Sequence, residues 1–72
     1  MKLQRVTSLY DLYNKANTNP YYAQLAIIAA NNLGGEIKTL SDAKKWLNLN
    51  ASETDESDVV EEINFCRDLV KE

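Results

Sequence analysis

Hydrophobic residues recur every three or four positions in several stretches of this chain, a pattern typical of amphipathic α-helices. The first stretch predicts a helix over residues 8–17, because Ser8 followed by Asp11 has the spacing of an N-terminal capping pair. Residues 17–20 (NTNP) then predict a turn. Residues 1–6 leave two alternatives open, a short strand or a first helical turn.

Residues 21–33 (YYAQLAIIAANNL) carry no charge and are apolar on nearly every side of a helix, which is typical of a buried helix. Asn19 and Pro20 suit the cap and first position of this helix, and Gly34 suits the left-handed residue that ends many helices. A membrane span is the alternative, because residues 16–35 are uncharged over about the length that a bilayer requires. The asparagines, proline and glycines in that stretch favour the buried helix.

Two further helices are predicted after the glycines. The third begins with Thr39 or Ser41 as its cap and ends near residues 48–50, where an acidic linker over residues 50–58 (NASETDESD) follows. The last helix covers residues 59–70. Four of its apolar residues step by four, three and four positions and form a seam suited to packing on another helix; these are Val59, Ile63, Cys66 and Val70.

The sequence therefore predicts a mostly α-helical fold. We expect one small domain over residues 1–72, a compact bundle of about four short helices around a buried central helix at residues 21–33. A short two-stranded β element formed by residues 1–6 and 36–39 remains an alternative for those two segments.

Composition removes several classes of function. The 72 residues include no histidine and one cysteine, so nucleophilic catalysis by Cys66 would lack the base that normally activates a thiol. Cys66 lies on the apolar seam, which favours a buried structural cysteine. We expect no enzyme activity, no metal site and no cofactor. A single cysteine and no apolar leader after Met1 indicate a cytoplasmic protein.

Charge is unevenly distributed. The net charge is −3, yet residues 1–50 carry +3 and residues 51–72 carry −6. Acids at the start of the last helix have four interpretations: stabilisation of the helix dipole, a calcium loop, a surface for a basic protein, or a disordered acidic tail. The calcium loop fits poorly, because valines fall where an EF-hand requires a ligand and a glycine. The acidic cluster comprises Glu53, Asp55, Glu56, Asp58, Glu61 and Glu62.

The last helix has a wider apolar arc than packing on one core requires, roughly 220° at 100° per residue. We therefore expect a non-catalytic module, an accessory or inhibitor protein, that binds another protein with a basic surface. The residues expected to contact that partner are Glu56, Asp58, Glu61, Glu62, Phe65 and Leu69.

Two alternatives belong to other classes. A nucleic-acid-associated regulator would use the basic residues of 1–50, although the acids of the last helix would repel phosphates if it acted as the second helix of a helix-turn-helix. A homodimer would be closed by the seam of the last helix. The basic residues in question are Lys2, Arg5, Lys15, Lys38, Lys44 and Lys45.

Overall fold

The computed structural model describes residues 3–53 and 56–70, without the side chains of residues 52 and 53. Helices α1 (Leu9–Thr18), α2 (Pro20–Asn32), α3 (Leu40–Glu53) and α4 (Glu56–Cys66) follow one another, and a short 3₁₀ turn, η1 (Arg67–Leu69), continues α4. The protein is mostly α-helical, as predicted. Within the described ranges there is no strand, so residues 3–6 and 36–39 do not form the β element considered above.

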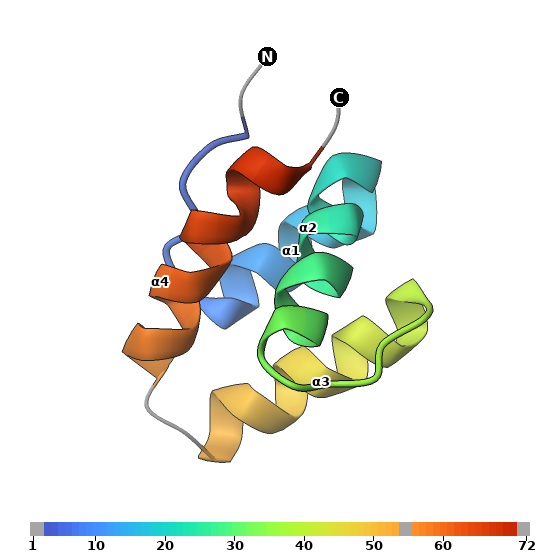
Figure 1. Cartoon of the computed structure of the whole chain (residues 1–72), viewed down its shortest axis with the longest axis vertical. Helices are drawn as coiled ribbons and strands as arrows, with labels where there is room; N and C mark the ends of the chain where they lie inside the picture. Colours follow the sequence, from blue (N-terminus) through green and yellow to red (C-terminus); the bar gives the residue numbers. More distant parts are fainter. Residues whose placement is uncertain (1–2, 54–55, 71–72) are drawn as a thin grey trace.

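Helix α2 is the centre of the bundle. It packs against α1, α3 and α4, and Figure 1 shows it between α4 on one side and α3 below. Leu25, Ala26, Ala29 and Ala30 are fully buried. Because alanine side chains are small, the neighbouring helices can approach α2 closely. The prediction of a buried central helix is confirmed.

The ends of α1 and α2 follow the predicted capping residues. The Ser8 hydroxyl accepts a hydrogen bond from the Asp11 amide at 2.9 Å, and the Asn19 side chain accepts from the Tyr21 amide at 2.9 Å. Gly34 has the positive φ of +96° expected at a helix end. The Gly35 amide, one residue further, donates to the Ala30 carbonyl at 2.9 Å and closes the end of α2.

The boundary between the last two helices was predicted incorrectly. Helix α3 continues to Glu53 instead of ending near residues 48–50, and α4 begins at Glu56 instead of Val59. At the predicted end the Asn50 side-chain amide donates to the Trp46 carbonyl one turn earlier at 2.8 Å, so this asparagine is accommodated within the helix. Acids in the first turn explain the earlier start of α4, since they stabilise the positive end of a helix dipole.

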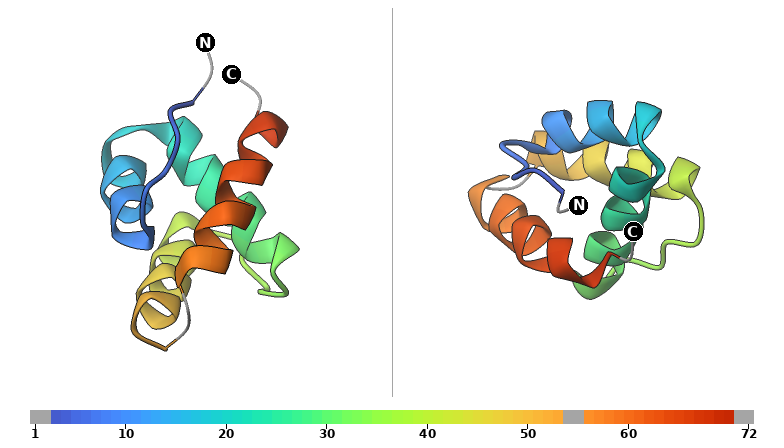
Figure 2. Two further views of the ribbon diagram at one scale, coloured as in Figure 1. Left: turned by 90° about the vertical axis from the view of Figure 1, so that its left-hand side faces the viewer. Right: turned by 90° about the horizontal axis from the view of Figure 1, so that it is seen from above.

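Residues 3–7 form an extended strap beside α4. Both views in Figure 2 place this segment between α1 and α4, and it runs along α4 from the end where η1 lies toward the start of that helix. Val6 is fully buried and Leu3 nearly so, and both belong to the same core as the helices. The strap therefore closes the side of the bundle that four helices leave open.

Candidate functional site

The outward face of α4 carries both charge and exposed apolar surface. Asp58 and Glu61 are exposed, and Glu62 is half-buried. Phe65 is 76% exposed and Leu69, in the following 3₁₀ turn, is 53% exposed. Their spacing of three, four and seven residues places them along one side of the helix. We call this set, Asp58, Glu61, Glu62, Phe65 and Leu69, the outer stripe.

The opposite face of α4 is occupied by the protein's own core. Ile63 and Cys66 are fully buried, and Val59 and Val70 pack against the same cluster. The Cys66 sulfur accepts a hydrogen bond from the Asn32 side-chain amide at 3.2 Å. Cys66 is thus the buried structural cysteine that was predicted. The seam assigned to a homodimer faces the core of the protein itself.

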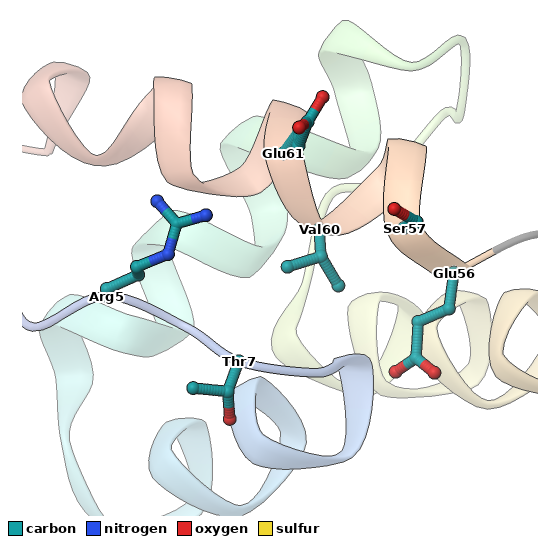
Figure 3. A pocket seen from close by; sticks show the side chains of 6 residues that line it. All are labelled: Arg5, Thr7, Glu56, Ser57, Val60 and Glu61. Atoms are coloured by element: carbon teal, nitrogen blue, oxygen red, sulfur yellow. The ribbon is translucent and has the colours of Figure 1, made fainter.

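Glu56 has an internal role that the sequence did not indicate. Its carboxylate accepts a hydrogen bond from the Leu9 backbone amide at 2.7 Å, across 47 positions of sequence. Leu9 is the first residue of α1, so Glu56 satisfies one of the amides that a helix start leaves free and places negative charge at the positive end of the dipole. Figure 3 shows this side chain extending from α4 toward the start of α1. The structure therefore separates Glu56 from the outer stripe.

We expect Glu56→Gln to lower the free energy of unfolding by about 1 kcal/mol, because the amide group keeps an acceptor but loses its charge at the start of α1. Urea unfolding followed by circular dichroism measures this change. The matched control is Glu61→Gln, which removes the same charge from an exposed position and should change stability by less than about 0.5 kcal/mol. Equal effects of the two substitutions would contradict the capping role.

An open hollow of about 470 Å³ lies between the strap and the first two turns of α4. Figure 3 shows Arg5 entering it from the strap and Val60 from α4, while Glu61 points away from the strap. The hollow combines one guanidinium with two carboxylates, of which Glu56 is already bonded to α1. It borders the outer stripe, since Glu61 belongs to both.

One buried side chain, Asn64, holds the strap in place. Its carbonyl oxygen accepts from the Val6 amide at 2.8 Å, and its amide nitrogen donates to the Val6 carbonyl at 2.8 Å and to the Val60 carbonyl at 3.0 Å. A single side chain thus satisfies both backbone polar groups of a buried residue. In the sequence, the sole indication of this role is a polar residue one turn after Val60 on the buried side of the helix.

Tyr22 and Arg67 complete the attachment of the strap. The Tyr22 hydroxyl accepts from the Gln4 amide at 2.7 Å. The Arg67 guanidinium donates to the Leu3 carbonyl at 3.0 Å and to the Asn64 carbonyl at 3.2 Å. Because Arg67 is turned toward the strap, the described residues of α4 and η1 present no basic side chain beside the outer stripe.

Two of the basic residues predicted to form a patch contact aromatic rings instead. The Lys15 ammonium lies 2.9 Å from the Asp11 carboxylate and 5.6 Å from the centre of the Tyr22 ring. The Lys44 ammonium lies 5.6 Å from the centre of the Tyr13 ring. Partial burial by itself raises the pKa of Asp11, but hydrogen bonds from Lys15 and Thr7 and the charge of Lys15 outweigh it, so the net pKa lies below its usual value.

The remaining basic and acidic residues are placed as follows. Arg5, Lys38 and Lys45 are exposed. Lys2 and Asp55, and the side chain of Glu53, fall outside the described residues. Within the described ranges, no three acidic, cysteine or histidine side chains gather as metal ligands do, and none of the helices has the length and apolar character of a membrane span.

Comparisons with protein-family models, with curated proteins and with solved structures find no match to this chain.

Proposed function

We propose that this chain is a small acidic protein-binding module, an accessory or inhibitor protein without catalytic activity, and that it contacts its partner through the outer stripe. One observation carries the proposal: Phe65, a large aromatic residue, is 76% exposed on a helix whose other face is fully packed. Aromatic residues are enriched at protein interfaces, where they supply much of the binding energy. Leu69 adds a second exposed apolar group within one turn of Phe65.

The polar contacts of α4 and η1 also support the outer stripe as the surface that contacts a partner. The structure uses Glu56, Asn64 and Arg67 to hold α1 and the strap. Asp58 and Glu61, by contrast, make no hydrogen bond or ion pair with the residues that the structure describes. Side chains that bond to no other described residue, placed beside exposed apolar groups, are available for recognition. We place this activity in the cytoplasm, where a single buried thiol stays reduced.

The nucleic-acid alternative receives less support from this geometry. Lys15 is neutralised by Asp11, and Lys44 lies over a tyrosine ring. Fewer cations then remain on residues 1–50 to neutralise phosphates, and affinity for nucleic acid depends on the number of phosphates neutralised.

Affinity capture from the native host, followed by mass spectrometry, tests the proposal. Immobilised wild-type chain is compared with Phe65→Ala/Leu69→Ala and with the matched control Tyr10→Ala/Leu49→Ala, which removes two other exposed apolar side chains from α1 and α3. We expect at least one protein to be retained by the wild type and the control but reduced about tenfold with the stripe variant, as for loss of an interface hot spot.

Circular dichroism and thermal unfolding provide the folding control, because substitution of exposed residues should change stability by less than about 0.5 kcal/mol each. Equal capture by all three proteins would remove the outer stripe as the contact. Capture lost only with the Tyr10/Leu49 variant would transfer the contact to α1 and α3.

A further inference from the structure

The geometry points to a specific class of partner: we propose that the outer stripe binds a basic amphipathic helix of another protein. This inference rests on the proposed function and names the occupant of the surface. The helix would set two apolar side chains on Phe65 and Leu69 and place Lys or Arg side chains over Glu61, Glu62 and Asp58.

Charged and apolar groups follow one another along α4 and η1 in a fixed order. The acids lie in the first two turns of α4, and the exposed apolar pair follows at the end of α4 and in η1, over about 16 Å if each residue advances the helix by 1.5 Å. A partner must therefore present apolar groups at one end of its contact and cations at the other. A uniformly apolar segment would bury the three carboxylates without counter-charges, which costs free energy.

The chain is strongly acidic around the outer stripe. Residues 51–72 carry a net charge of −6, and Arg67, the basic residue that the structure describes in α4 and η1, is bonded to the strap. Arg5 lines the same hollow as Glu61, but Glu61 points away from the strap that carries Arg5. Among the described residues, no ion pair neutralises an acid of the outer stripe. Lysine or arginine on the partner would supply the positive charge and would also speed association.

The helical structure of the stripe limits how a partner can bind to it. The stripe belongs to a helix, whose backbone groups bond to one another, and the described residues include no strand edge to which an extended peptide could add. Recognition must therefore use side chains. A partner helix presents side chains with the same repeat of three and four residues, so its ridges fit beside those of α4.

The probes for the test are designed alanine-based helical peptides with a fluorescent label. The first carries two leucines one turn apart, followed by three lysines spaced as the acids of the stripe are spaced. The second replaces the lysines by glutamates, and the third keeps the lysines and replaces both leucines by alanine. Fluorescence anisotropy measures their affinities, and backbone-amide chemical shifts of the labelled chain locate the contact.

We expect the first peptide to bind at least about tenfold more tightly than the other two, with the largest shifts between residues 58 and 69. Phe65→Ala should weaken this binding about tenfold. Glu61→Lys should weaken it markedly at 0.05 M salt and little at about 1 M, where charges are screened beyond about 3 Å. The control Glu36→Lys makes the same change of net charge at an exposed loop position and should have little effect.

Three results would overturn the inference. They are equal binding of the basic and acidic peptides, undiminished binding by Phe65→Ala, or shifts confined to α1 and α3. A second copy of the chain is another occupant, because Lys45 and Leu49 lie exposed one turn apart on α3. Sedimentation that shows a dimer lost with Phe65→Ala would assign the stripe to self-association and would likewise overturn it.

The outcomes separate this inference from the proposed function. Stripe-dependent capture from the host without preference for the basic amphipathic peptide would leave the protein-binding module standing and remove the basic helix. Specific binding of the peptide with no stripe-dependent capture would leave the preference for a basic helix standing and remove the contact with a host protein through the stripe.

Discussion

Asn64→Ala is expected to lower the free energy of unfolding by about 3 kcal/mol, because it leaves the Val6 amide and carbonyl buried without partners and each such group costs about 1–3 kcal/mol. For a chain of this size that loss corresponds to a decrease in melting temperature of about 15 °C. Calorimetry or thermal circular dichroism measures it. The expected cause is specific: the strap loses its attachment while the helices remain.

Two comparisons establish that cause. Asn14→Ala removes the same side chain from an exposed position on α1 and should change stability by less than about 0.5 kcal/mol. Tyr22→Phe removes the acceptor for the Gln4 amide and should cost about 1 kcal/mol. Hydrogen exchange of the Val6 amide should accelerate in Asn64→Ala before the amides of α2 respond. A loss below about 1 kcal/mol for Asn64→Ala would contradict the role of this amide.

Leu25→Ala should destabilise the protein by about 3 kcal/mol, within the range of about 2–5 kcal/mol for buried leucines. Leu25 is fully buried in α2, and this helix packs on all three others, so the cavity would open where the bundle is held together. Urea unfolding gives the value. Leu49→Ala is the matched control, since Leu49 is 55% exposed and its truncation should cost much less. Comparable losses would show that α2 is not the centre of the core.

Much of the fold follows from the order of residues alone. The uncharged run over residues 21–33 predicted a buried central helix, because only burial on all sides suits a helix without a polar face. Local hydrogen bonds also set the starts of α1 and α2, so Ser8 and Asn19 could be identified as caps. These features depend on residues within four positions of one another, which a single sequence displays directly.

The features that sequence analysis missed depend on contacts between distant residues. Glu56 and Leu9 are 47 positions apart, and Asn64 and Val6 are 58 apart. Nothing near Glu56 in the sequence distinguishes it from Asp58 or Glu61, yet the first caps another helix and the other two face solvent. Only the packing of α4 against α1 shows which acids are structural and which are candidates for binding.

The packing of α4 on the core also limits which part of its broad apolar arc is exposed for binding. The sequence predicted a partner contact through the spare apolar arc and the acids of the last helix, with a homodimer closed by the seam as an alternative. Ile63 and Cys66 prove to be core residues, whereas Phe65 and Leu69 remain exposed beside the acids. The contact predicted to involve six residues thus reduces to five, with Glu56 assigned to the stability of α1.

Cross-saturation transfer is the most direct measurement of the claim that the outer stripe is the binding face. The captured partner is irradiated in complex with the deuterated, amide-labelled chain, and loss of amide signal marks the residues in contact. The proposed function predicts the largest losses between Asp58 and Leu69, with α1 and α3 unaffected. Losses centred on Tyr10 or Leu49, with signals of the stripe unchanged, would contradict it.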